Sequence, residues 1–438
     1  MLYFSGNQIR ILEAGVPVPD ESESDGSPSR KSGWLDLSRV RIAINYQDEW
    51  SQMFREAWRL QKEFFWNEQL SGVDWNAVYR RYENLLSRIG SRSELSDLIW
   101  EMQGELGTSH AYEYGGDYPF SPQYPVGQLG ADLEYEPSRK AWVFRKIYRG
   151  DIWRIHQHSP LAEPGQQVQE NDLLLEIGGV PLDGSTSPGE LLVHQAGQAV
   201  QLTVKTPGKK ESKRKIIVKT LIHEGKTRYR EWVKQNLKFV EAQSEGRVGY
   251  LHIPDMDTEG IAEFHRGFLS QVDREGLIID ARFNAGGWVS PLVLEKLTHR
   301  HLGYDVPRWG SPESYPYHTL RGHLVLITNQ FTGSDGDMFT ASFKQLKLGK
   351  VIGKRTWGGV VGIDGRYQLV DGTTTTQPQY SIWFHHAGWS VENYGVDPDL
   401  VVEDPPQSYS NGMDHQLKLA VEVIQKILEE DPLPKIQD

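Results

Sequence analysis

Apolar side chains recur at helical spacing in the early part of the chain. Over residues 48–65 they fall at positions i, i+3, i+4 and i+7, which predicts an amphipathic helix. The same reasoning predicts helices near residues 75–88 and 93–106. The third helix runs into a loop that contains His110, so residues 45–119 are predicted to form a small helical subdomain that presents a histidine.

The pattern then changes to short alternating strands separated by glycine and proline. Over residues 120–222, the order and spacing of three segments resemble a PDZ domain, namely residues 159–162, 172–180 and 200–204. In such domains a peptide adds a strand to a sheet edge, and its terminal carboxylate sits in a nest of backbone N–H groups. A β-rich spacer that binds nothing is the alternative.

Strands and helices alternate from residue 247 onward. The runs at 248–253, 276–281 and 323–328 are nearly continuous in apolar residues, which is typical of strands covered on both faces. This alternation predicts an α/β domain with a mostly parallel sheet. Helices are expected at residues 258–272, 289–299, 338–346 and 413–429, with a β-rich stretch at 350–403.

The chain begins with a strand-like segment at residues 3–12 and then a stretch of linker composition up to Gly33. A lone strand has no partner, so it is interpreted as the end of something larger upstream. The whole is predicted to be an α+β multidomain protein with units at residues 1–44, 45–119, 120–222 and 223–438.

Composition narrows the function classes. With a net charge of −12 and a pI of about 5.7, the chain is a poor partner for nucleic acid. It has no cysteine, which excludes disulfides, thiolate metal sites and a cysteine nucleophile. No run approaches the ~18 apolar residues of a membrane span, and the first residues lack the features of a signal peptide. We therefore expect a cytoplasmic location, no membrane contact and no metal or cofactor.

Ser334 stands where an apolar strand gives way to a helix. A serine at such a turn exposes its hydroxyl, and the free N–H groups that follow can stabilise a developing oxyanion. This placement suits a nucleophile. The alternative is an ordinary helix N-cap, with Asp337 three residues on completing a capping box.

Three other segments offer partners for such a nucleophile. His110 lies in the loop fixed by the preceding helix, next to Ser109. The Gly286-Gly287 pair follows a buried strand and lets backbone N–H groups approach a ligand closely. Glu392 lies in a loop rich in glycine and proline, where a carboxylate is able to orient either the histidine or a second hydroxyl. Taken singly, each has an ordinary structural alternative: a loop histidine, a tight turn and a solvated charge.

Taken together, five segments resemble the catalytic half of the tricorn proteases, relatives of the tail-specific processing peptidases. The resemblance covers roughly residues 45–430 and implies a catalytic domain of the crotonase or ClpP kind. The segments are GTSHAY at 107–112, RFNAGG at 282–287, GSDGD at 333–337, GKRTWGGV at 353–360 and ENYGVDPD at 392–399.

The resemblance assigns roles to these residues. Ser334 is expected to attack the scissile carbonyl, with His110 as the general base. Ser109 and Glu392 are expected to form a relay behind the imidazole. The N–H groups of Asp335 and of Gly287 are expected to form the oxyanion hole, and Gly286 is the alternative donor.

One difference separates this chain from the tail-specific peptidases. Those relatives use a serine and a lysine, but Gly359 stands where that lysine is expected, and Lys354 lies on the wrong side of the Thr-Trp-Gly motif. The base is therefore expected to be histidine. The open alternatives are a tail-specific processing peptidase and an inactive PDZ-containing protein that only binds peptides.

The resemblance also implies a substrate preference and an assembly. Tricorn-type enzymes cut short peptides, including proteasome products later trimmed by aminopeptidases, after basic or hydrophobic residues. An acidic residue of a neighbouring subunit lines their specificity pocket, and Asp305 is the matching position. A homo-oligomer, a hexamer by resemblance, is expected. The upstream β-propellers of the family have no counterpart here beyond the strand at residues 3–12, interpreted as a propeller remnant.

Overall fold

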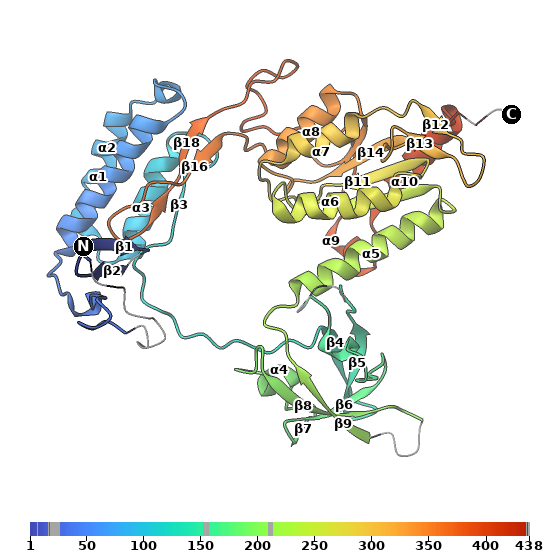
Figure 1. Ribbon diagram of the computed structural model, residues 1–438, viewed down its shortest axis with the longest axis horizontal. Coiled ribbons are helices and arrows are strands. Elements are labelled where there is room, and N and C mark those ends of the chain that lie inside the picture. Colours follow the sequence, from blue (N-terminus) through green and yellow to red (C-terminus); the bar gives the residue numbers. More distant parts are fainter. Residues whose placement is uncertain are drawn as a thin grey trace.

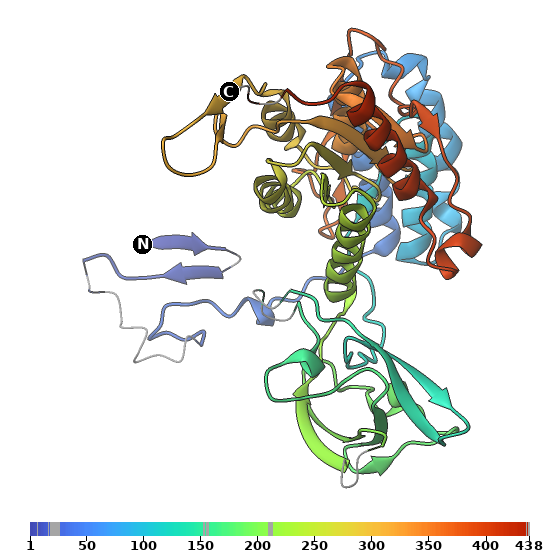
Figure 2. The ribbon, with the colours of Figure 1, turned by 90° about the vertical axis from the view of Figure 1, so that its right-hand side faces the viewer.

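The computed structural model describes residues 1–6, 8–15, 17, 27–151, 154, 157–208, 213–434 and 436. Figure 1 shows a layer of helices on one side, an α/β unit on the other and a β-rich unit below. Figure 2 shows helix α5 (Gly225–Gln243) rising from the β-rich unit into the α/β unit. Each region therefore has its own layers and its own core.

The helical subdomain contains three helices packed on their apolar faces, as predicted. Asn45, Asp74 and Ser91 cap the first turns by accepting backbone N–H groups. Met53 and Leu95 are fully buried at the centre. The helices are α1 (Tyr46–Phe64), α2 (Trp75–Glu83) and α3 (Arg92–Gly104), with short 3-10 turns at Leu37–Arg39, Leu70–Gly72 and Leu86–Arg88.

A β-rich segment from late in the chain, residues 362–380, packs against these helices and is called the β excursion (Figure 1). The Gln61 amide donates to the carbonyl of Thr376, and the Thr376 hydroxyl donates to the carbonyl of His110 at 2.6 Å. The loop with His110 is thus held by a segment that follows Ser334 in sequence. The strands here are β16 (Gly362–Asp364) paired with β18 (Gln377–Tyr380), and β17 (Thr374–Thr375) paired with β3 (Glu113–Tyr114).

The β-rich unit is an antiparallel sheet in the order β4-β5-β6-β8-β9, with β7 against β6. Phe144, Leu174 and Leu202 are fully buried in its core. The first of the expected PDZ segments, residues 159–162, contains a 3-10 turn at Pro160–Ala162. The elements are β4 (Ala131–Glu136), β5 (Ala141–Ile147), β6 (Leu173–Ile177), β7 (Val180–Pro181), α4 (Pro188–Leu191), β8 (Ala199–Lys205) and β9 (Lys213–Lys219).

The α/β unit is built on a parallel five-stranded sheet in the order β10-β11-β14-β15-β19, which confirms the predicted sheet. Every residue of β10 and β11 is buried because both faces are covered. The strands are β10 (Val248–His252), β11 (Gly276–Asp280), β14 (His323–Thr328), β15 (Gly349–Gly353) and β19 (Leu400–Val401).

Helices form a layer on each face of this sheet. Phe264, Leu326 and Phe339 belong to the core beneath α6, α7 and α8, whereas Val325 and Ile424 belong to the core beneath α5 and α10. Both cores are continuous with the sheet, so the ends of its strands are held firmly. The bounds are α6 (Thr258–Gln271), α7 (Ser290–Thr298), α8 (Asp335–Gln345), α9 (Pro406–Ser410) and α10 (His415–Glu430).

The structure differs from the sequence predictions in three places. The lone strand at residues 3–12 was wrong, because β1 (Leu2–Ser5) and β2 (Gln8–Ile11) form an antiparallel hairpin. The long helix α5 was missed, since charged residues interrupt its apolar positions. Helix α8 begins at Asp335, three residues before the predicted start, because polar residues of its first turn are buried. Much of the expected linker, residues 18–26, lies outside the described residues.

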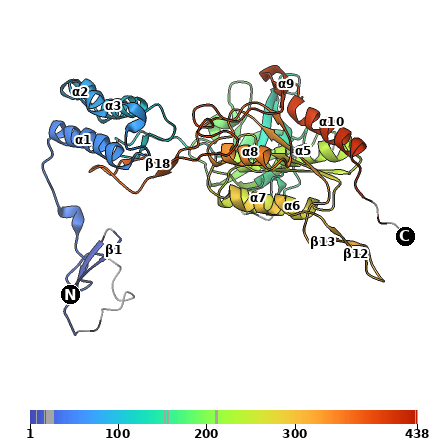
Figure 3. The same ribbon diagram turned by 90° about the horizontal axis from the view of Figure 1, so that it is seen from above.

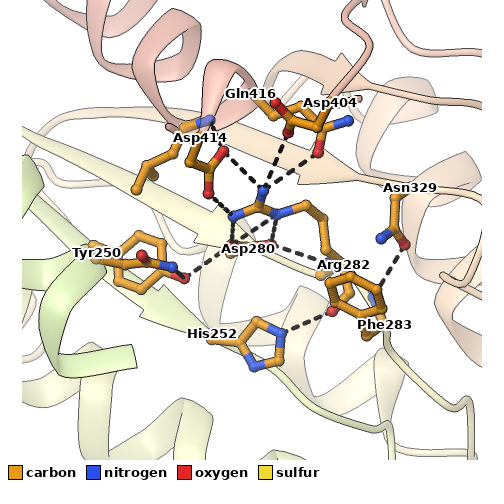
Figure 4. Close-up of polar contacts among 12 residues, drawn as sticks. Tyr250, His252, Asp280, Arg282, Phe283, Asn329, Asp404, Asp414 and Gln416 are labelled. Atoms are coloured by element: carbon orange, nitrogen blue, oxygen red, sulfur yellow. Dashed lines mark hydrogen bonds and ion pairs between the residues drawn. The ribbon is translucent and has the colours of Figure 1, made fainter. Parts of the chain in front are cut away.

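A buried ion network joins the end of β11 to the start of α10 (Figure 4). The Arg282 side chain is fully buried, and its guanidinium donates to Asp280 at 2.7 Å and to Asp414 at 2.8 Å. Gln416 and Asp404 complete its surroundings. Burial opposes ionisation of Asp280, but the Arg282 charge outweighs it and holds the pKa of that carboxyl below its usual value.

Removing the cation from this network should be strongly destabilising. Arg282→Met leaves the buried carboxylate of Asp280 and the partly buried one of Asp414 without their cation, and we expect the free energy of unfolding to fall by about 3–5 kcal/mol. Chemical denaturation measures the difference. Arg247→Met is the matched control, because the Arg247–Glu275 pair is exposed at 44% and 42% and its loss should cost at most about 1 kcal/mol. Equal losses in the two variants would contradict this account.

Candidate active site

Ser334 lies at the turn between β14 and α8. Its backbone has φ 55° and ψ −119°, a conformation that residues other than glycine rarely adopt. It occupies the N-cap position of α8, but its side chain makes no capping hydrogen bond. Instead, Ser334 Oγ lies 3.2 Å from Nε2 of His110. The side chain of Ser334 is therefore directed to the histidine and does not cap the helix.

His110 comes from the loop between α3 and β3, in the helical subdomain. It has a left-handed backbone with φ 62°, and its ring packs edge-on against Trp357 with the centroids 5.3 Å apart. Burial lowers the pKa of His110, and the negative charge of Glu392 opposes that shift. The imidazole is therefore neutral near pH 7, when Nε2 is able to accept a proton.

The carboxylate of Glu392 accepts hydrogen bonds from two parts of the chain. Oε1 accepts from the Thr108 hydroxyl at 3.1 Å and from the Ser109 N–H at 2.7 Å, and Oε2 accepts from the Ser109 hydroxyl at 3.1 Å. Oε2 also accepts from the N–H groups of Val360 at 2.7 Å and Val361 at 3.1 Å. One carboxylate thus connects the helical subdomain to the α/β unit.

The other ring nitrogen of His110 faces a tyrosine. Nδ1 lies 3.1 Å from the hydroxyl of Tyr112. The Ser109 hydroxyl, expected to link Glu392 to the imidazole, reaches Glu392 but makes no hydrogen bond with the ring of His110 among the described residues. Sequence reasoning missed Tyr112, since its spacing from the histidine does not distinguish it from an ordinary packed tyrosine.

Two backbone N–H groups at the turn are available to a ligand. Those of Gly287 and Asp335 donate to no other described residue. The N–H of Gly286 is engaged, because it donates to Asn284 Oδ1 at 3.0 Å. Of the two glycines that the sequence left open, Gly287 therefore carries the available donor.

Both positions of the glycine pair require glycine. Gly286 has φ +81° and Gly287 has φ +144°, conformations that side chains disfavour. A Cβ on Gly286 would lie 2.5 Å from the Cβ of Ser334, and one on Gly287 would lie 2.0 Å from the carbonyl oxygen of Met256. The oxyanion loop, defined as residues 282–287, thus approaches the serine as closely as backbone allows.

Two carboxylates in the first turn of α8 connect it to its surroundings. Asp335 accepts from the N–H of Ser290 at 2.9 Å and from its hydroxyl at 2.5 Å. Asp337 accepts from the N–H groups of Gly358 at 2.8 Å and Gly359 at 3.3 Å. Burial raises the pKa of Asp335, and it raises the pKa of Asp337 to about 6. Neither role was predicted from the sequence.

Asp305 lies far from the serine of its own chain. It ends β12 (Gly303–Asp305), which pairs with β13 (Glu313–Tyr315) in a hairpin that projects on the side away from the helical subdomain (Figure 3). The neighbouring Tyr304 borders a cavity with Arg247 and Glu275, which precede the first residues of β10 and β11. Ser334 follows the opposite end of the sheet, roughly 20 Å away along a six-residue strand.

Neither a metal site nor a membrane-spanning helix is present among the described residues. The described residues contain no group of three or more histidine or acidic side chains suited to hold a metal ion. Within the same ranges no helix is long and apolar enough to cross a membrane.

Three protein families match successive parts of the chain. Residues 46–104 match the tricorn protease C1 domain, residues 127–223 match the tricorn protease PDZ domain, and residues 247–402 match peptidase family S41. The PDZ match confirms the identity predicted for the β-rich unit.

Curated relatives and a solved structure agree with these matches. A tricorn protease homolog of Saccharolobus solfataricus is 46% identical over 96% of the chain, and the tricorn protease of Thermoplasma volcanium is 42% identical over 98%. A crystal structure of the tricorn protease superimposes over 90% of the chain with a TM-score of 0.86 and 38% identity. The chain spans only 38 to 40% of the length of these proteins.

The order of the three family matches, the identities and the shared fold lead to one conclusion. The chain belongs with the tricorn protease family, and residues 247–402 form its region of peptidase family S41.

Proposed function

We propose that this chain hydrolyses short peptides through an acyl-enzyme on Ser334, with His110 as the general base. The observation that carries this proposal is the 3.2 Å separation between Ser334 Oγ and His110 Nε2, next to two unengaged N–H groups. A neutral imidazole at hydrogen-bond distance from the hydroxyl of a half-buried serine with a strained backbone is an arrangement that activates the serine.

The reaction then has two halves. Ser334 Oγ bonds to the carbonyl carbon while its proton passes to His110, and the carbonyl oxygen becomes an oxyanion held by the N–H groups of Gly287 and Asp335. Each such donor is typically worth about 3 kcal/mol of barrier. The C–N bond breaks as His110 returns the proton to the leaving amine. Water, deprotonated by the same imidazole, hydrolyses the ester and restores the serine.

Two polar groups orient the imidazole in this scheme. With Nε2 accepting from the serine, Nδ1 carries the proton and donates to the Tyr112 hydroxyl, 3.1 Å away. Glu392 supplies the negative charge that stabilises the imidazolium, and through Ser109 it fixes the loop on which His110 stands. The relay predicted behind the histidine is thus proposed to act through charge and loop position.

A tail-specific mechanism with a lysine base fits this chain poorly. The lysine position is taken by Gly359, where an added Cβ would lie 2.2 Å from the ring of Trp357. A longer side chain therefore has no room unless the indole moves. The inactive peptide-binding alternative is disfavoured because the serine, the histidine and the free N–H groups all stand within one site.

Replacing the nucleophile tests the proposal directly. Fluorogenic peptides with Lys, Arg or Phe before the reporter should be cleaved by the wild-type chain, and Ser334→Ala should lower kcat by about 10³-fold or more. A fluorophosphonate probe should label the wild type and spare the variant. Labelling without cleavage would indicate a competent serine that lacks the rest of a longer protein. If the wild type neither cleaves the peptides nor reacts with the probe, the mechanism is refuted.

The pH profile tests His110 as the base. Because only the neutral imidazole accepts a proton, kcat/KM should rise with pH through the pKa of His110, which burial places below its usual value of about 6.5. Glu392→Gln removes a charge that raises this pKa. The acid limb should then move to still lower pH while kcat falls, and a shift to higher pH would contradict the assignment. Asp337, with a pKa of about 6, should titrate alike in both proteins.

We further propose that Asp305 serves a neighbouring copy of the chain. Its hairpin lies near the starting ends of β10 and β11, whereas Ser334 follows the far end of β14. Asp305 is therefore too distant to reach the serine of its own chain. A carboxylate there attracts a lysine or arginine side chain of a bound peptide. This arrangement requires an oligomer and is consistent with the homo-oligomer expected from the resemblance.

Complementation distinguishes a shared site from a self-contained one. Asp305→Asn should reduce cleavage after Lys or Arg by about tenfold, roughly 1.4 kcal/mol, and leave cleavage after Phe little changed. When mixed and reassembled with the inactive Ser334→Ala variant, it should regain part of its cleavage after Lys or Arg, since each variant supplies what the other lacks. If cleavage after Lys or Arg by the mixture only falls in proportion to the dilution of the Asp305→Asn variant, Asp305 acts within one chain or not at all.

The wider role remains a prediction that rests on the resemblance. It includes a hexameric state, a cytoplasmic location, proteasome products as substrates and aminopeptidases as downstream partners.

A further inference from the structure

The oxyanion loop is aligned along the segment that follows β10. Within residues 253–256, the N–H of Ile253 donates to Asp280, its carbonyl accepts from the Asn284 amide at 2.9 Å, and the N–H of Met256 donates to Gly286 at 2.7 Å. These bonds set the path of the loop but leave its first peptide unit, between Arg282 and Phe283, to other groups.

Side chains hold that peptide unit at both ends (Figure 4). The carbonyl oxygen of Arg282 lies 2.8 Å from Nε2 of His252, and the N–H of Phe283 donates to Asn329 Oδ1 at 3.1 Å. Phe283 has a left-handed φ of 61°, which is costly for an aromatic residue. Such a conformation persists only where neighbouring groups impose it, so the two hydrogen bonds bear on the whole loop.

The protonation of His252 is fixed by its partners. A carbonyl oxygen only accepts, so Nε2 carries the proton, and Nδ1 accepts from the Tyr229 hydroxyl at 2.9 Å. The side chain is buried, its ring packs edge-on against Trp232, and burial lowers the pKa of His252. It is thus a neutral donor of defined direction.

We infer that His252 is a positioning residue for the oxyanion hole. By donating to the Arg282 carbonyl it orients the first peptide of the loop, and through Phe283 and Asn284 it directs the N–H of Gly287 toward the oxyanion. It does not touch the substrate. The inference rests on the proposed function, since it concerns the same site.

The test compares His252→Leu with His252→Gln. Leucine fills the space without a donor, whereas the Gln amide places an N–H near the position of Nε2. We expect His252→Leu to lower kcat about 10- to 100-fold with KM little changed. The reason is that a displaced Gly287 N–H stabilises the oxyanion of the transition state less well. The rate of fluorophosphonate labelling at Ser334 should fall in parallel. His252→Gln should restore most of both rates.

Ser244→Ala is the matched control, since it removes a buried hydroxyl that holds the opposite end of β10 and lies away from the site. It should lower the melting temperature but leave kcat unchanged. Equal rates in wild type and His252→Leu, or equal losses in the Leu and Gln variants, would overturn the inference and leave the proposed function intact. A wild type that neither cleaves nor labels would overturn both.

Discussion

The rest of the active site depends on the carboxylate of Glu392. It accepts five hydrogen bonds, three from Thr108 and Ser109 in the helical subdomain and two from Val360 and Val361 in the α/β unit. A half-buried carboxylate is stabilised when several donors satisfy it at once, and these donors come from both units, so the hydrogen bonds favour one placement of the helical subdomain. The 3.2 Å approach of His110 to the serine follows from that placement.

A second, independent frame holds the opposite side of the serine. The Arg282 network anchors the start of the oxyanion loop to α10, and His252 and Asn329 hold its first peptide. Fixed dipoles and charges of this kind spare the protein from reorganising when an oxyanion forms. The proposed base and the proposed oxyanion donors are therefore held by different parts of the fold, one between subdomains and one inside a single domain.

The regular parts of this protein could be predicted from its sequence because they follow simple periodicities. The strand at β14 and the helices α1 and α6 repeat apolar residues at the spacing their burial requires. The residues of the loops could be assigned to a site only through motifs, because spacing along the chain does not show that His110 and Ser334, 224 positions apart, come together. Tyr112 and His252 act through a single atom each, and no pattern in a sequence marks a hydrogen bond. The hairpin at the N-terminus escaped because Gly6 gives a tight turn within one apparent strand.

The division of nucleophile and base between two folding units has a consequence for biosynthesis. His110 belongs to a segment made before Ser334, Glu392 and the β excursion that holds the His110 loop. Neither unit alone contains both the proposed nucleophile and the proposed base. The two side chains therefore meet only after both units have folded and docked, and the proposed chemistry has to wait for that step.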